Sequence, residues 1–461
     1  MPDLPSRTWF SECLRIVLLV LSLSLAGCGG GGGGSSGDIR SVQLPPVAGC
    51  ELEDSKRWLL GYMQDQYLWY DRIPSVDASR HESIDSYFGA LLYPGGGLDP
   101  ATPDRWSFIE ITASYEQFFG DGRVLGYGLA VAGLELRGHP EEALRIRYVE
   151  PNSPAASAGL QRGDVVLSLN GVSSSDMITR NDFSLLTPKA VGDALELRIR
   201  AASGERTVSV IANVFDLMPV SPASVLRTHA GRTLGYLLVK DFINQANPQF
   251  ELAFAQFKSA GVTELVLDLR YNGGGLVTVA RDLASFIGGS QSSGDAFVTL
   301  KFNDKQQKQN STYAFALPSS RLDLTRVFIL SGQRTCSASE LLINGLKPFV
   351  TVVQIGDTTC GKPVGFIPAS RCGTTFNAVN FEVFNALDVG RYWDGLAPSC
   401  RVADEFVLPL GNLDESLLAA ARQYADTGAC PVAGQAGRTR SPRMPGDILT
   451  EPGERQGMWL R

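Results

Sequence analysis

Three residues in one region of the sequence have types suited to nucleophilic catalysis. Ser337 precedes Glu340 by three residues in the stretch RTCSASE, and Lys362 follows Ser337 by 25 residues (362 − 337). A serine hydroxyl becomes a nucleophile when a base takes its proton, and a lysine can be that base if burial keeps it neutral. Ser-x-x-Glu is also the pattern of a helix capping box, in which the serine has only a structural role. An isolated lysine is by default solvated, so each residue alone is ambiguous.

The histidines offer no alternative base. His81, His139 and His229 lie in different segments, and none is beside a nucleophile motif. A Ser-His-Asp triad is therefore not indicated. The sequence also has no His-Glu-x-x-His motif and no Cys/His zinc spacing, so we expect neither a metal nor another cofactor.

The elements around these residues indicate an α/β domain, because strands and helices alternate beyond residue 230. The strand expected over 265–269 runs into the glycines of 273–275, and the strand over 327–330 runs towards Ser337. Lys362 lies just past the next strand, and active sites of α/β folds gather at such strand ends. The other elements expected here are a strand over 234–239, a strand over 351–355, and helices over 247–260 and 277–287.

Residues 115–215 have a different texture, with short alternating strands and no long helix. The stretch PNSPAASAGLQRGDVVLSLNGV (151–172) closely resembles the signature of a PDZ domain: a helix begins near Ser153, a buried strand follows, and Asn-Gly forms a hairpin turn. PDZ domains bind extended peptides by strand addition and hold a C-terminal carboxylate in a backbone nest. The resemblance places Tyr127, Gly128, Leu129 and Ala130 in that carboxylate loop. A PDZ fold used only as a spacer is the alternative.

The motifs GYLLVKDF, LVLDLRYNGGG and CSASELLINGLKPFVTVVQIGDTTCGK, in this order, resemble those of the C-terminal processing peptidases, or tail-specific proteases. The resemblance covers most of the chain from about residue 50 to 430. It implies a multidomain α/β plus β fold: a crotonase/ClpP-like α/β peptidase core with a PDZ domain and a small N-terminal helical cap. It also implies a serine endopeptidase in which Ser337 is the nucleophile and Lys362 the base. The oxyanion hole would use backbone N–H groups of Ala338 and of Gly273 or Gly274.

One position departs from the family pattern. Many members have a glutamine four residues after the lysine to orient it, whereas this chain has Phe366, as in a cysteine-rich lipoprotein branch. Asn380 or Asn385 is within sequence reach, but nothing singles either out. Two alternatives therefore remain: a weak or inactive PDZ-bearing adaptor that binds C-terminal peptides, and a crotonase-like enzyme acting on small thioesters, which leaves the PDZ insert unexplained.

Acidic and basic residues near the site receive structural assignments. Asp268 and Arg270 are expected to form a structural pair at a strand end, and Glu340 to be a charge at a helix start rather than an acid catalyst.

The first residues resemble a bacterial lipoprotein signal. An apolar run over 16–25, too short to span a bilayer, ends in Leu-Ala-Gly-Cys28 and is followed by a flexible Gly/Ser tether. We expect Cys28 to carry lipid and to anchor the exported chain to a bilayer, at the outer membrane facing the periplasm. The net charge of −7 and the lack of a basic stripe argue against nucleic acid as a partner. The expected partners are proteins or peptides with exposed C-termini.

The domain boundaries follow from these assignments: signal peptide 1–27, tether 28–49, helical domain 50–114, PDZ domain 115–215, peptidase core 216–430 and disordered tail 431–461. Export implies an oxidising compartment, so the six cysteines beyond Cys28 suggest disulfides. If Ser337 contacts Lys362, then Cys336 and Cys360 are also near each other. A bridge between Cys360 and Cys372 is nearly as favourable, and Cys50 with Cys430 would join the ends of the mature chain.

Overall fold

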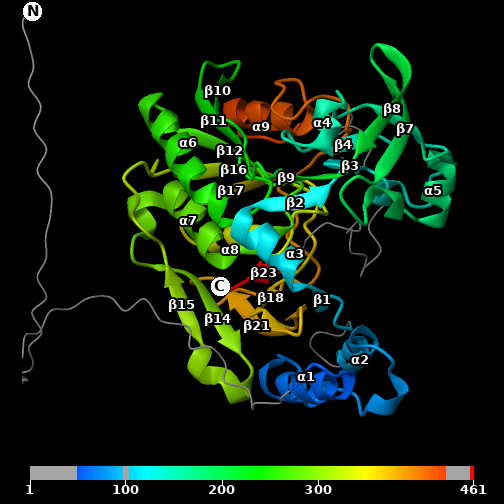
Figure 1. Ribbon diagram of the computed structural model, residues 1–461. Coiled ribbons are helices and arrows are strands. Elements are labelled where there is room, and N and C mark those ends of the chain that lie inside the picture. Colours follow the sequence, from blue (N-terminus) through cyan, green and yellow to red (C-terminus); the bar gives the residue numbers. More distant parts are fainter. Residues whose placement is uncertain (1–48, 97–102, 432–456, 461) are drawn as a thin grey trace, which may run out of the picture. The chain divides into compact units, whose positions relative to one another are not determined.

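The computed structural model describes residues 49–96, 103–431 and 457–460 (Figure 1). The predicted signal peptide, Cys28 and nearly all of the tether lie outside these residues. Among the residues described, no helix is both long enough and apolar enough to cross a membrane.

The N-terminal helical region is built on aromatic residues that pack against the core. Helix α1 (Leu52–Gln66) stacks Trp58 on Tyr62, with ring centroids 5.5 Å apart, and Trp58 also contacts Phe376 of the core. The predicted helical cap is therefore present, and the stretch 104–110 connects it to the core, because strand β1 (Phe108–Ile111) pairs with strand β20 (Thr374–Asn377). The remaining elements are α2 (Ile84–Leu91), α3 (Thr112–Glu116) and β19 (Ala369–Arg371), which pairs with β20.

The PDZ segment has a hydrophobic core of its own. Ser153 caps a short helix with Pro154 in its first turn, and Asn170 and Gly171 both have positive φ (44° and 80°), as the predicted hairpin turn requires. The strands are β2 (Arg123–Gly126), β3 (Leu129–Val131), β4 (Ile146–Val149), β5 (Val165–Leu169), β6 (Val172–Ser173), β7 (Ala194–Ala201), β8 (Gly204–Ile211) and β9 (Asn213–Asp216). The helices are α4 (Pro154–Ser157) and α5 (Ser174–Arg180).

The α/β core is a six-stranded sheet between two layers of helices, as the alternating pattern predicted. Its strand order is β10-β11-β12-β16-β17-β22, with β10 antiparallel and the others parallel. The strands are β10 (Ser224–Arg227), β11 (Thr233–Leu238), β12 (Glu264–Asp268), β16 (Arg326–Ser331), β17 (Thr351–Gly356) and β22 (Cys400–Arg401). The helices are α6 (Asn247–Ser259), α7 (Val277–Gly288), α8 (Ala338–Leu346) and α9 (Ser416–Thr427).

Alternation along each strand separates the two layers. In β12, Leu265 and Leu267 join the hydrophobic cluster that contains α6, α7 and α8, whereas Val266 joins the cluster that contains α9. Successive strand residues point to opposite faces, so a continuous apolar run fills both layers. Because these strands are parallel, the ends of β12, β16 and β17 meet at one edge, where the candidate catalytic residues follow.

A second six-stranded sheet has the order β13-β23-β18-β21-β14-β15. Its strands are β13 (Gly274–Leu276), β14 (Ala296–Phe302), β15 (Ser311–Ala314), β18 (Val364–Phe366), β21 (Val379–Phe384) and β23 (Gly457–Trp459). Strand β23 corrects the prediction of a disordered tail over 431–461, because residues 457–460 are ordered and buried. Met458, Trp459 and Leu460 are too few to show a hydrophobic periodicity in the sequence. They are ordered only because they have partners far away in the chain. Residues 432–456 and 461 lie outside the described residues.

The disulfides confirm one expected pairing and correct two others. Cys336 is bonded to Cys360, with Cα atoms 5.1 Å apart, so the alternative bridge from Cys360 to Cys372 is wrong. Cys372 is instead bonded to Cys50. The third bridge joins Cys400 to Cys430, so the expected bond between Cys50 and Cys430 is also wrong.

Candidate active site

Ser337 lies at the sharp turn between β16 and α8, in a conformation that L-residues rarely adopt. Its φ and ψ are 57° and −109°, and the side chain is fully buried. Such a conformation costs about 1–3 kcal/mol and persists only where surrounding contacts hold it. The Ser337 Oγ has no hydrogen-bond partner among the described residues, although its own N–H donates to Glu340. The backbone is thus fixed as in a capping box.

The carboxylate of Glu340 joins the backbone at Ser337 to the backbone at Lys362. Its Oε2 accepts hydrogen bonds from the N–H of Ser337 (2.9 Å) and the N–H of Lys362 (2.8 Å). Its Oε1 accepts from the N–H of Gly361 (2.7 Å) and from the hydroxyl of Thr359. Burial raises the pKa of Glu340, and these donors act in the opposite direction. Glu340 is therefore more than the helix-start charge expected from the sequence, because it binds the backbone of both candidate catalytic segments.

Lys362 is almost completely buried, and this burial lowers the pKa of its ammonium group to about 7. The negative charges of Asp104 and Glu340 oppose the shift without cancelling it. A lysine with this pKa is partly neutral near neutral pH and can therefore accept a proton. Its Nζ lies 4.1 Å from the ring centroid of Phe366 and 5.3 Å from that of Trp106.

These two rings flank the lysine side chain at the position where a family glutamine is absent. Phe366 thus contacts Lys362 directly, through its aromatic face instead of a hydrogen bond. Asn380 accepts a hydrogen bond from Ile367 N–H, and Asn385 donates to Asn344. The sequence had no signal for Trp106, because its contact with the lysine depends on how the cap packs.

The glycine loop brings backbone next to the start of α8. A Cβ added at Gly274, whose φ is +116°, would lie 3.1 Å from the Ala338 nitrogen, so only glycine allows this approach. The Ala338 N–H belongs to the first turn of α8, where the helix dipole favours negative charge. The N–H of Gly274 donates to the Asn272 side chain (2.8 Å), so this geometry does not favour Gly274 as an oxyanion donor.

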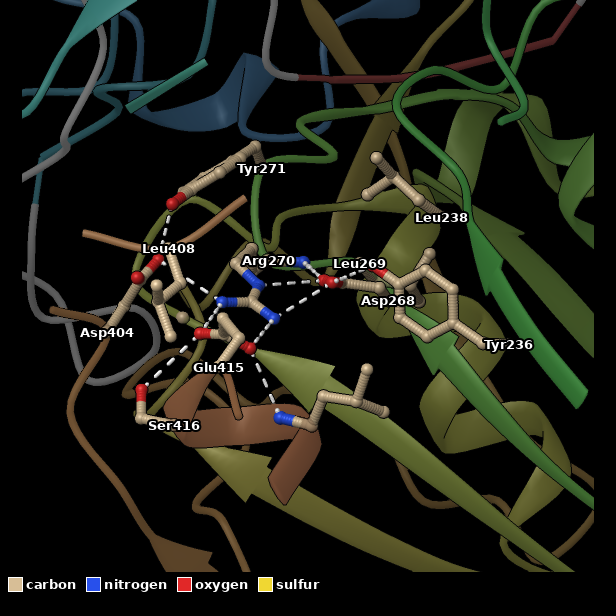
Figure 2. Close-up of polar contacts among 12 residues, drawn as sticks. Tyr236, Leu238, Asp268, Leu269, Arg270, Tyr271, Asp404, Leu408, Glu415 and Ser416 are labelled. Atoms are coloured by element: carbon tan, nitrogen blue, oxygen red, sulfur yellow. Dashed lines mark hydrogen bonds and ion pairs between the residues drawn. The ribbon is translucent and has the colours of Figure 1, made fainter. Parts of the chain in front are cut away.

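A buried ion-pair network fixes the end of β12, from which the glycine loop departs (Figure 2). Arg270 donates to Asp268 (2.9 Å) and to Glu415 (2.7 Å), so the expected structural role of Asp268 and Arg270 is confirmed. The Tyr271 hydroxyl donates a hydrogen bond to Asp404. Arg162 of the PDZ segment donates another hydrogen bond to the same carboxylate (2.5 Å). Several hydrogen bonds satisfy each buried charge, as burial of ions requires.

The PDZ segment also contacts the residues directly before the nucleophile. Glu135 forms an ion pair with Arg334 at 2.7 Å, and Arg334 lies three residues before Ser337. The Arg334 guanidinium holds the pKa of Glu135 below its usual range, although burial acts in the other direction.

The predicted carboxylate loop lies in a pocket that reaches the glycine loop. Tyr127, Gly128, Leu129 and Ala130 line it together with residues of the core, among them Lys240, Asp241, Gly273 and Arg334. Gly128 has a φ of +79°, and a Cβ there would collide with Ser153 at 1.9 Å, so glycine is required at this point of the loop.

The three histidines have partners other than the candidate catalytic residues, as expected. His81 pairs with Ser86, His139 pairs with Glu141, and His229 lines a surface pocket beside Asp426.

The fold and site define an α/β protein with a serine-peptidase-like centre and a PDZ domain. The sequence matches the model of peptidase family S41 over residues 233–368. It also matches the peptidase S41 N-terminal domain over 54–108 and a PDZ domain over 145–200. Residues 54–108, 145–200 and 233–368 are thus similar to the parts of an S41 peptidase with a PDZ domain, which confirms the resemblance derived from the motifs.

Individual relatives support this assignment. A crystal structure of a putative S41 protease from Bacteroides fragilis matches with a TM-score of 0.63 and 26% identity, covering 81% of this chain and 97% of that one. A carboxyl-terminal-processing protease of Picosynechococcus is 26% identical over 57% of this chain and 60% of its own length. The corresponding protease of Synechocystis is 24% identical over 56% of each chain. The present chain thus spans less than two thirds of these curated relatives.

Substitution of Glu340 by glutamine should loosen the site. The glutamine amide places an N–H donor where a carboxylate oxygen of Glu340 accepts two hydrogen bonds. Because these bonds are lost, we expect the free energy of unfolding to fall by about 2–4 kcal/mol. Labelling of Ser337 by a fluorophosphonate should also slow, because the two catalytic segments lose their common acceptor. Denaturant unfolding and labelling rates measure the two effects, with the exposed Glu116→Gln as control. Equal values for both variants would contradict the role given to Glu340.

The labelling rate of Ser337 should rise with pH through about 7, the pKa of Lys362. Below this pH the lysine is charged and cannot accept the serine proton; above it the lysine is neutral, so between pH 6 and 8 the neutral fraction grows from about one tenth to nine tenths. Rate constants for fluorophosphonate modification measure this profile. A rate that does not change across this range would exclude Lys362 as the base.

Proposed function

We propose that the chain is a serine endopeptidase that cleaves proteins near unstructured C-terminal tails. The observation that carries this proposal is the Glu340 carboxylate, whose one oxygen binds the N–H groups of both Ser337 and Lys362. The carboxylate supports a Ser-Lys dyad, because it holds the backbone N–H groups of both residues at the same oxygen atom. The curated relatives, named carboxyl-terminal-processing proteases, support the substrate class.

The proposed reaction uses only groups of this chain and water. Lys362 takes the proton of Ser337 as Oγ attacks the scissile carbonyl, and the N–H of Ala338 with the glycine loop stabilises the oxyanion. Protonated Lys362 then gives its proton to the leaving amine as the scissile C–N bond breaks. The acyl group stays on Ser337 as an ester, the acyl-enzyme. Water, deprotonated by Lys362, hydrolyses the ester and restores Ser337.

The PDZ domain would capture the C-terminal tail of the substrate. The pocket between the predicted carboxylate loop and the glycine loop supports this role, since both line it. An adaptor that binds tails without turnover is the second candidate. It was suggested by Phe366, but the contact between this ring and the Lys362 ammonium gives Phe366 a positioning role compatible with catalysis.

The N-terminal segment supports a further proposal, on location. The lipobox ending at Cys28 and the Gly/Ser run after it suggest a lipid anchor in the bacterial envelope, with the protein facing the periplasm. The substrates would then be envelope proteins with exposed C-terminal tails.

Substitution of either dyad residue should abolish cleavage. On an unfolded protein with an apolar C-terminus, we expect Ser337→Ala to lower kcat/KM by about 10³-fold or more, and Lys362→Ala by about 10²–10⁴-fold. Quantification of the cleaved C-terminal fragment by mass spectrometry measures this. Equal cleavage by all three proteins would remove the mechanism, and binding without cleavage by the wild type would favour the adaptor.

Replacement of Cys28 by alanine should release the protein from membranes, because the thiol that would carry the lipid is gone. Fractionation of cells that express the wild type or Cys28→Ala, with Cys13→Ala as control, measures the change. Unaltered membrane association of Cys28→Ala would argue against the anchor.

A further inference from the structure

Strand β23 lies between two segments that belong to the candidate active site. On one side Gly457 N–H donates to Gly273 O (3.0 Å), and the strand runs parallel to β13 of the glycine loop. On the other side Leu460 N–H donates to Phe366 O (3.0 Å), on the strand that follows Lys362. β13 and β18 are not paired with each other, so β23 connects them. This is the geometry of a peptide bound by strand addition.

The side chains of the strand are enclosed. Met458, Trp459 and Leu460 are 0%, 1% and 5% exposed. The Trp459 ring packs against Phe119 (4.7 Å between centroids) and Phe366 (5.7 Å).

The indole of Trp459 also has a polar partner. Its Nε1–H donates to the side-chain oxygen of Asn377 at 2.8 Å. Aromatic walls with one acceptor at the far end form a pocket suited to an indole, because the apolar body and the polar tip are both satisfied.

One carbonyl of the strand lies beside the proposed oxyanion site. A Cβ at Gly274 would be 2.1 Å from the Gly457 oxygen and 3.1 Å from the Ala338 nitrogen, so both groups border the same small volume. The register places Gly457 opposite Gly274, and Met458 opposite Gly275. The carbonyl of Gly457 therefore lies on the side of the glycine loop that faces the start of α8, and Trp459 lies two residues beyond it.

We propose that residues 457–460 occupy the substrate channel of this chain's own active site and compete with external substrates. The occupant also defines the selectivity of the channel, which takes an extended peptide with an aromatic residue, best tryptophan, two positions after the carbonyl held near Ala338. The inference rests on the proposed function for the identity of the channel. A covalently attached competitor has a high effective concentration, so it can restrain the site without high intrinsic affinity.

Removal of the strand should increase turnover. We expect deletion of residues 457–461, and the milder Trp459→Ala, to raise kcat/KM on an unfolded substrate by about tenfold or more, mainly through a lower KM. The peptide Gln-Gly-Met-Trp-Leu-Arg, added to the deletion variant, should inhibit competitively, and its Trp→Ala form about tenfold more weakly. Leu252→Ala, which alters a 74% exposed side chain on α6, is the control and should change nothing. Intact mass confirms that the strand is present in the full-length protein.

A binding experiment separates this inference from the proposed function. In a Ser337→Ala background, the fluorescently labelled peptide should bind the deletion variant at least about tenfold more tightly than the full chain, as measured by anisotropy. Trp459→Phe, which keeps the ring but loses the bond to Asn377, should give an intermediate value. Peptide binding in this background, together with no cleavage by any variant that keeps Ser337, would support the channel and reject the peptidase. A deletion variant that neither binds peptide nor gains activity would make β23 a permanent part of the fold and overturn the inference.

Discussion

The site depends on the carboxylate of Glu340, because it is the common acceptor for the main chains of Ser337 and Lys362, the proposed nucleophile and base. Ser337 begins α8 and Lys362 follows β17, and nothing in the local sequence brings these segments together. The N–H groups of Ser337 and Lys362 both donate to one oxygen of Glu340, and these two hydrogen bonds hold the segments together. The Cys336–Cys360 bridge joins the same two segments covalently. The positive φ of Ser337 can persist because the surrounding chain is held in this way.

Burial then determines the chemistry of Lys362. Water would keep the ammonium charged, but here Trp106 and Phe366 take the place of water around it. The pKa falls to about 7 although two carboxylates oppose the change. Trp106 comes from the segment that connects the helical cap to the core, so the cap contributes to the site as well as to packing. The lowered pKa therefore comes from burial, while the face of Phe366 positions the ammonium group.

The glycine loop depends on rigid support from below and on strand pairing from the side. Below it, Arg270 lies among Asp268, Glu415 and Asp404, an arrangement in which buried charges satisfy one another. Beside it, β23 pairs with Gly274–Leu276 and continues the sheet towards β18. The backbone that approaches Ala338 is thus also the backbone that pairs with β23.

The sequence alone determined the strands, the helices and the PDZ turn chemistry, because these follow from local periodicity and from glycine, proline and asparagine at fixed positions. It also predicted a Ser337–Lys362 dyad, which stays a proposal, and the Cys336–Cys360 bridge, which the structure contains. It could not assign the partners of Cys50 and Cys430, the ring of Trp106 over the lysine, or the central role of Glu340. It was wrong about residues 457–460, which were expected to be disordered. Each of these depends on contacts between residues far apart in the chain, and a short apolar stretch such as Met458-Trp459-Leu460 has no order of its own. Only the tertiary structure, by supplying strand partners on both sides and an aromatic pocket, decides that it folds.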